Sequence, residues 1–340
     1  MYYRNNSIVY SPSDLTRFME SPFASWMDRF VLDNKDTRAY KDAPDPLMQR
    51  LADKGYAHED KQEAEFLAQG KSVVKITSKH EQAIEDTLMA MKEGADVIIQ
   101  AYLNLEPFYG YADFLVKVSG ASELGDYHYE VWDTKLASSV KPKFMMQLCC
   151  YAEMLESIQG VLPKSLTVSL GNDEKATYQT INYFAYYQQL KKQFLNEQSQ
   201  FIPTNFPDPY DSKSYLDWSE YAEAYLEECD HLSLVANIRR SQVQKLEQAG
   251  IMTLTELANS ELLEVPKISP EVFTRLKTQA QYQLKSRGQA KPAYMVIKPK
   301  DEDAQVLGLQ HLPPHSNYDV FFDIEGFMQH IIIKFPNRFE

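Results

Sequence analysis

The sequence predicts an α/β protein, with a mixed sheet flanked by helices and a helical module after it. Three strand-like apolar runs follow one another between residues 97 and 132. Segments with apolar residues at helical spacing come before and after these runs. An order of helices, a β-meander and then helix–strand–strand–helix favours one sheet with helices on its faces.

The elements before the meander follow from local signals. Ser11-Pro-Ser-Asp places capping residues ahead of Leu15 and Phe18, which indicates a helix start over residues 11–20. Residues 36–46 contain two prolines among polar residues and are expected to form a loop. Next we expect a helix over 47–69, a short strand over 73–76 and a helix over 78–94 that ends at Gly94.

The meander and the residues after it complete the sheet. Expected strands are 97–105, 111–118, 127–132, 165–170 and 176–182, and expected helices are 143–158 and 184–199. Residues 201–215 are rich in proline and turn formers, which indicates a domain exit. The predicted domains are therefore 1–205, a helical module over 206–290, and a linker with one further strand over 291–340.

Charge and cysteine content narrow the functional class. The net charge of −13 weighs against a nucleic-acid partner, but residues 239–300 carry 11 Lys or Arg against 5 Asp or Glu, a net of +6. No apolar run is long enough to span a membrane, and the start lacks the apolar core of a signal peptide. Three cysteines, two of them adjacent, make no disulfide framework, so we expect a cytoplasmic protein.

Two carboxylates and a lysine fall on neighbouring predicted strands. Asp133 and Lys135 are two residues apart, so their side chains point to one face of the sheet, while Thr134 points to the other and offers its carbonyl. Asp113 lies on the preceding strand. Carboxylates bind Mg²⁺ through hard oxygens and leave water ligands in place, and a lysine beside them can donate to a phosphate. An isolated Asp-x-Lys is most often a surface ion pair, so the context carries the inference.

The helix expected next contributes Gln147 and Tyr151, which share a helix face because they are four residues apart. Considered alone, Gln147 is a surface amide and Tyr151 is a core aromatic residue. Their position directly after the Asp-x-Lys strand favours a place beside the carboxylates.

Taken together, these motifs resemble the RecB-like branch of the PD-(D/E)XK nuclease superfamily. The resemblance rests on Gly110-Tyr-Ala-Asp-Phe-Leu, on Asp133-Thr-Lys and on Gln147-Leu-Cys-Cys-Tyr, in that order. Gly55-Tyr-Ala-His-Glu is similar to the upstream helix motif of that branch, and Ser11-Pro-Ser-Asp is similar to its first helix. The resemblance covers about residues 8–200 and implies a restriction-endonuclease-like mixed sheet.

The resemblance also implies roles. His58, Asp113, Asp133 and the Thr134 carbonyl would ligate Mg²⁺ or Mn²⁺, and Glu59 is an uncertain extra ligand. Lys135 would be the catalytic lysine. Gln147 and Tyr151 would line the site and hold DNA or Lys135 in place. From composition alone, His58 is equally a partly exposed helix residue.

Many members of this branch hold an iron–sulfur cluster on four cysteines. Here Ser21 stands where the first cysteine would be, and only Cys229 lies beyond the nuclease core. Three cysteines cannot supply four thiolates, so we predict no cluster. Cys149 and Cys150 are expected to be buried small apolar residues.

Two further resemblances fall in the C-terminal third. Ala249-Gly-Ile with Thr253 is similar to a helix–hairpin–helix element, which offers backbone amides at a helix start to phosphate; a plain packing module is the alternative. Tyr318-Asp-Val-Phe-Phe-Asp-Ile-Glu-Gly resembles the first strand of a DnaQ-like exonuclease of the RNase H fold. Only 15 residues follow Glu325, so we expect this second domain to be truncated and inert.

The sequence therefore predicts a metal-dependent nuclease that hydrolyses phosphodiester bonds in DNA through a metal-activated water. RNA is also a possible substrate from the sequence, which identifies no helicase or repair partner. The alternative is a catalytically vestigial module that binds nucleic acid or recruits a partner, which the acidic N-terminal part favours.

Overall fold

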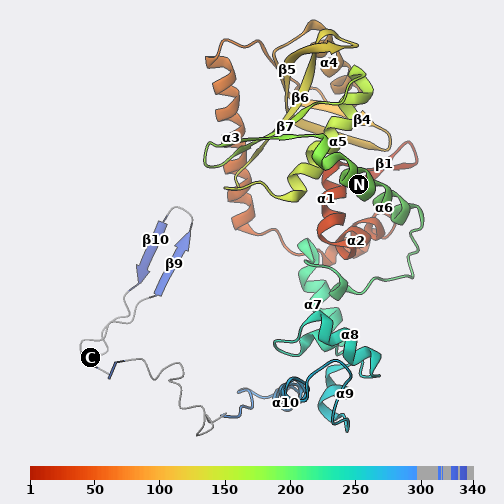
Figure 1. The fold of residues 1–340 in the computed structure, drawn as a ribbon, viewed down its shortest axis with the longest axis vertical. Coiled ribbons are helices and arrows are strands. Elements are labelled where there is room, and N and C mark those ends of the chain that lie inside the picture. Colours follow the sequence, from red (N-terminus) through yellow and green to blue (C-terminus); the bar gives the residue numbers. More distant parts are fainter. Residues whose placement is uncertain (297–312, 315, 317–322, 328–329, 335–340) are drawn as a thin grey trace. The chain divides into compact units, whose positions relative to one another are not determined.

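The computed structural model describes residues 1–296, 313–314, 316, 323–327 and 330–334 (Figure 1). The chain divides into two compact units, Met1–Leu284 and Lys285–Glu340, which are described separately. A mixed sheet of six strands, flanked by helices, lies in the first unit. The expected α/β class is therefore confirmed.

The elements of the first unit have the following bounds. The strands are β1 (Tyr2–Arg4), β2 (Ser7–Val9), β3 (Val73–Lys75), β4 (Val97–Leu105), β5 (Phe108–Ser122), β6 (Gly125–Lys135), β7 (Ser165–Leu170) and β8 (Lys175–Gln179). The α-helices are α1 (Pro12–Glu20), α2 (Pro22–Asp33), α3 (Pro46–Ala68), α4 (His80–Glu93), α5 (Pro142–Gln159), α6 (Ile181–Ser199), α7 (Ser219–Glu228), α8 (Arg240–Gln248), α9 (Leu254–Asn259) and α10 (Pro270–Ser286), the last of which runs into the second unit. Short 3₁₀ helices are η1 (Lys35–Tyr40), η2 (Pro209–Asp211), η3 (Leu216–Trp218) and η4 (Leu232–Leu234). Across the described ranges, none of the helices combines the length and the apolar character that a membrane span requires.

The main sheet has the strand order β3-β4-β5-β6-β7-β8. The pairs β3–β4 and β6–β7 are parallel, and the other pairs are antiparallel. Parallel neighbours need a crossover connection, and α5 supplies it between β6 and β7. The loop that follows the end of β6 therefore leads into α5.

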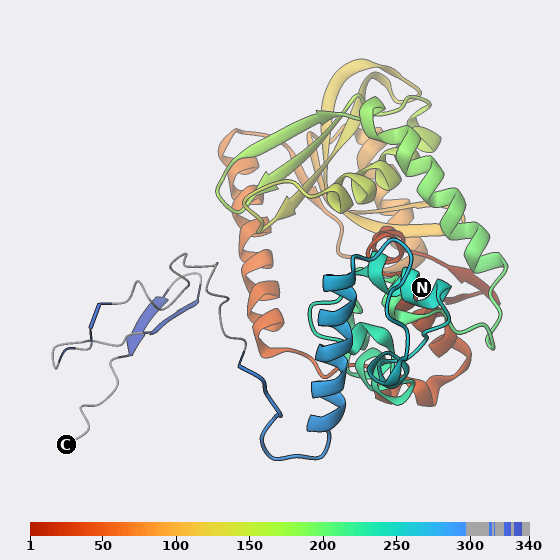
Figure 2. The ribbon, with the colours of Figure 1, turned by 60° about the horizontal axis from the view of Figure 1, so that its bottom comes forward.

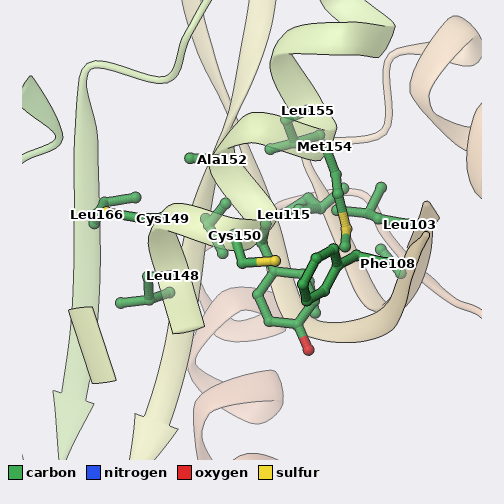
Figure 3. Close-up of a cluster of buried hydrophobic side chains, with 14 of the residues drawn as sticks. Leu103, Phe108, Leu115, Leu148, Cys149, Cys150, Ala152, Met154, Leu155 and Leu166 are labelled. Carbon is green, nitrogen blue, oxygen red and sulfur yellow. The ribbon is translucent and has the colours of Figure 1, made fainter. Parts of the chain in front are cut away.

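The two faces of the sheet pack on different helices. One face forms the main core with α1, α4, α5 and α6. In Figure 3, Cys149 and Cys150 of α5 lie among the apolar side chains of this core, and both are buried as expected. On the other face, Phe66 of α3 packs against residues of β4 and β5. Figures 1 and 2 both show α3 standing along one flank of the sheet.

Several element predictions need correction. Helix α2 and the β1–β2 hairpin were not expected from the sequence. The start of α2 nevertheless has a clear signal, because Pro22 occupies the first turn and the Ser21 hydroxyl accepts a hydrogen bond from the Ala24 amide at 3.0 Å. The expected loop 36–46 is partly the 3₁₀ helix η1. Strand β8 ends before residue 180, because α6 begins at Ile181.

The proline-rich segment after α6 returns to α2. Phe23 and Trp218 are both fully buried in one aromatic cluster, which Phe206 also contacts. The Phe23 amide donates to the Ser212 hydroxyl at 3.0 Å, and Trp218 Nε1 donates to Asp28 Oδ1 at 3.2 Å. The segment expected to be a domain exit is thus packed against the first helices.

Residues 232–284 have a small apolar core of their own, to which α8, α9 and α10 contribute. In the second unit, β9 (Asp323–Phe327) and β10 (His330–Lys334) form an antiparallel hairpin in which Asp323 pairs with Lys334. The expected strand Tyr318–Gly326 is covered by β9 in its second half, while residues 318–322 lie outside the described residues.

Candidate active site

Asp113 lies beside the point where the ladder between β5 and β6 ends. Phe114 and Trp132 form the last regular pair at this end of the ladder. Beyond it, the Asp113 carboxylate takes the place of a backbone acceptor. Asp113 Oδ2 accepts from the Thr134 amide at 3.0 Å and from the Thr134 hydroxyl at 3.1 Å. The Thr134 side chain, expected on the far face, thus reaches the first carboxylate.

Asp133 is buried with 1% of its surface exposed. Lys135 Nζ lies 2.6 Å from Asp133 Oδ2, so the two side chains share a face. Asp133 Oδ1 is buried without a hydrogen-bond partner, while Oδ2 is engaged by the Lys135 ammonium group. Burial raises the pKa of Asp133 to about 8; Lys135 opposes this shift and Asp113 adds to it.

Lys135 keeps its proton despite being largely enclosed. Burial acts to lower the pKa of Lys135, but the negative charges of Asp133 and Asp113 outweigh this effect and raise it. Nζ also lies 5.5 Å from the centre of the Phe144 ring, at the start of α5. The site therefore presents an ammonium group at neutral pH.

Helix α5 brings Tyr151 to the carboxylates. Tyr151 is 4% exposed, and its hydroxyl donates to the Tyr111 carbonyl on β5 at 2.6 Å. Burial, and then the charges of Asp133 and Asp113, raise the pKa of Tyr151, whereas contact with Gln147 lowers it. Tyr151 is thus a neutral hydroxyl that holds β5; its donated bond goes to the strand and not to Lys135.

Gly110 makes the approach of α5 to β5 possible. A Cβ atom at this position would lie 2.8 Å from Pro12 Cδ and 3.0 Å from Tyr151 Cε1. The contact with Pro12 is shorter than carbon atoms tolerate and the contact with Tyr151 is tight, so glycine favours the packing of α1 and Tyr151 on this stretch of β5.

Gly110→Ala is expected to destabilise the chain by about 1–3 kcal/mol, because the added methyl group overpacks this contact. Chemical denaturation measures the change, and Gly55→Ala in α3, where the same methyl group meets no atom within 4 Å, is the control. Equal stability of Gly110→Ala and the wild type would show that α5 shifts freely.

His58 does not join the carboxylates. Its Nε2 lies 3.1 Å from the Ser169 carbonyl of β7, so the ring is engaged at the far side of β6 from β5. Across the residues that the structure describes, no group of three or more His, Cys, Asp or Glu side chains is spaced to hold a metal ion. The ligand role implied for His58 would require its ring to leave Ser169.

The next residue of α3, Glu59, does reach the site. Burial and the charge of Asp113 raise the pKa of Glu59 to about 7, and Lys135 acts in the opposite direction. Gln100 Nε2 donates to Glu59 Oε2 at 3.2 Å. Helix α3 therefore presents its glutamate, and not its histidine, to Asp113 and Lys135.

Gln100 was not anticipated from the sequence. It has a φ of +54° within β4, a backbone conformation that costs a residue other than glycine on the order of 1 kcal/mol. Ile99 pairs with Phe114 and Ala101 pairs with Ala112, which places Gln100 opposite Asp113. A glutamine within an apolar strand gives no signal of this strain in the sequence.

The donors at this site suit a divalent cation. Carboxylates are hard oxygen ligands of the kind that Mg²⁺ and Mn²⁺ take. Asp133 Oδ1 is buried without a hydrogen-bond partner, which leaves its lone pairs available, whereas Oδ2 contacts Lys135. The Thr134 amide faces Asp113, and its carbonyl is expected on the same side because both groups of one extended residue point the same way. The residues therefore fit such a cation by their chemistry.

The backbone amides at and just before the start of α9 already donate hydrogen bonds to side chains of the same chain. Glu256 Oε2 accepts from the Met252 and Thr253 amides at 2.6 and 3.2 Å. Asp230 Oδ2 accepts from the Thr255 amide at 2.8 Å. A phosphate bound at these amides would have to displace two carboxylates, so the helix start expected to bind phosphate is here a capped helix.

No protein-family model matches this sequence, and a search of curated proteins also finds no match.

Proposed function

We propose that this chain is a divalent-cation-dependent nuclease that hydrolyses phosphodiester bonds in DNA. The observation that carries the proposal is the meeting of two carboxylates and one ammonium group where the ladder between β5 and β6 ends. Asp133 is buried there, with Oδ1 lacking a hydrogen-bond partner and Oδ2 2.6 Å from Lys135 Nζ. An apolar side chain would stabilise this core at least as well as a buried carboxyl group with one oxygen unpaired.

Each side chain has a distinct part in the proposed reaction. Asp113 and Asp133 would hold the cation, and Glu59 is a nearby carboxyl group whose pKa responds to the charges of Asp113 and Lys135. A bound divalent cation lowers the pKa of water and offsets charge on the phosphate. Lys135 donates from its ammonium to the phosphate or orients the attacking water. Tyr151 keeps α5 fixed against β5, and Gln147 is proposed to line the site.

The family of the chain and the region that holds the DNA are also proposals. The order β4-β5-β6, with the Asp-x-Lys strand followed by α5, supports membership of the RecB-like branch of the PD-(D/E)XK superfamily. Residues 239–300, with their net of +6, are proposed to help hold the DNA backbone. The capped start of α9 favours side-chain contacts there over the amide contacts of a helix–hairpin–helix.

The experiment is a cleavage assay on supercoiled plasmid, single-stranded DNA and single-stranded RNA, with Mn²⁺, Mg²⁺ or EDTA. We expect DNA cleavage with either cation and none with EDTA. If the folded chain cleaves none of these substrates with either cation, the catalytic proposal fails. The vestigial module then stands, and DNA binding without cleavage would support it.

A further inference from the structure

A cavity of about 360 Å³ opens between α7 and the segment that joins α2 to α3. It shares no lining residue with the candidate active site. Figure 1 shows α7 next to α2 within the first unit. Three tyrosines, one alanine and two glutamates form most of its wall: Tyr40, Tyr221, Tyr225, Ala224, Glu220 and Glu228.

Side chains from one face of helix α7 form one wall of the cavity. Tyr221, Ala224, Tyr225 and Glu228 follow one another at intervals of three, one and three residues, so they share one face of the helix. The small Ala224 leaves a hollow between the larger side chains. Phe206 supports the two rings from behind, with ring centres 6.3 Å from Tyr221 and 4.7 Å from Tyr225.

Tyr40 forms the opposite wall, and its segment is fixed to α7. The Asp42 carboxylate accepts from the Ser219 amide at 2.8 Å and from the Glu220 amide at 3.0 Å. The Tyr40 ring centre lies 5.8 Å from that of Tyr221, yet Tyr40 remains 62% exposed. The Asp42 carboxylate therefore ties the Tyr40 segment to the start of α7, with the Tyr40 ring largely exposed to solvent.

The charge of the cavity is negative. Among the described residues, neither Glu220 nor Glu228 forms an ion pair. Lys41 also lines the cavity, but its Nζ lies 2.8 Å from Asp217 and 3.2 Å from Asp28, so its charge is neutralised. Phosphate-bearing ligands are repelled by such a wall, and cations are attracted to it.

We propose that this cavity binds an arginine side chain from a basic segment of a partner protein. Cations bind over the faces of aromatic rings, and arginine does so more often than lysine. A planar guanidinium group can stack on a tyrosine while its edge donates to Glu220 or Glu228. The binding is independent of the proposed nuclease activity, because none of these residues lies in the candidate active site.

The test measures binding of two fluorescein-labelled peptides to the full chain by fluorescence anisotropy. One peptide alternates glycine with arginine, and the other carries citrulline in place of each arginine. Citrulline has the size and shape of arginine without its charge. We expect saturable binding of the arginine peptide and none of the citrulline peptide.

Two pairs of variants distinguish binding in the cavity from binding to any acidic surface of the chain. Tyr40→Leu removes the ring and is expected to weaken binding by roughly 3- to 30-fold, whereas Tyr40→Phe keeps the ring and the affinity. Glu228→Gln is expected to weaken binding. Glu223→Gln removes the same charge from α7 outside the cavity and should leave the affinity unchanged.

Three results would overturn the proposal. They are equal binding of the citrulline peptide, wild-type affinity in Tyr40→Leu, and equal losses in Glu223→Gln and Glu228→Gln. Tyr40 is exposed, so its replacement leaves the fold intact, and circular dichroism checks this. Cleavage of DNA, measured separately, neither supports nor contradicts the result.

Discussion

Replacing Lys135 by methionine is expected to slow DNA cleavage by at least about 10²-fold, the usual loss when a positioned proton donor is removed. Methionine keeps the length and apolar stem of the lysine and removes only its charge and donors. The ammonium group that Asp133 holds at 2.6 Å is then missing from the phosphate side of the site. The fold should survive, because burial already raises the pKa of Asp133, which can take up a proton once its partner is gone.

The matched control is Lys164→Met, at an exposed lysine that precedes β7. Both variants and the wild type are assayed on the same plasmid with Mn²⁺, and their unfolding is compared. A contaminating nuclease would cleave equally in all three preparations. Cleavage by Lys135→Met at the wild-type rate would remove this lysine from the mechanism and leave the vestigial alternative.

The fold class and the strand-borne part of the site were predictable because both follow from local patterns. Alternation along β6 places Asp133 and Lys135 on one face, and an apolar meander specifies neighbouring strands. Helix α2 was not predicted although Ser21 and Pro22 are a helix-start signal. A short helix of mixed residues shows only weak hydrophobic periodicity. The tight packing at Gly110 depends on α1 and α5 together, and no window of sequence contains that information.

The part of the site contributed by α3 was not predictable. His58 and Glu59 are adjacent in sequence, and the turn of the helix decides which of them faces β5. That rotation is set by Phe66, which packs on the sheet, and by Gln62, whose Oε1 accepts from the Ser169 hydroxyl at 3.0 Å. His58 is thereby directed to the Ser169 carbonyl, and Glu59 is left to meet Gln100.

Asp133→Asn is expected to abolish cleavage and also to flatten the pH dependence of stability. The pKa of Asp133 is about 8 in the folded chain and about 3.9 when unfolded. Because this pKa is higher in the folded chain, Asp133 contributes to the free energy of unfolding fully below about pH 4. That contribution falls as the pH rises to about 8, by up to about 1.4 kcal/mol per pH unit. Lys135, whose pKa is also raised, keeps its charge throughout this window. Asparagine cannot ionise, so this loss disappears.

The measurement is urea denaturation in EDTA at about pH 5 and about pH 8. We expect the stability of Asp133→Asn relative to the wild type to rise by about 2 kcal/mol or more between these values. Any fixed cost of burying the amide cancels in this comparison, and the raised pKa of Glu59 acts equally in both proteins. Asp126→Asn, at an exposed position near the start of β6, should show no such change. If Asp133→Asn and the wild type lose stability in parallel, Asp133 is ionised in the folded chain. The burial of Asp133 with Oδ1 unpaired then no longer argues for a site shaped to receive a cation.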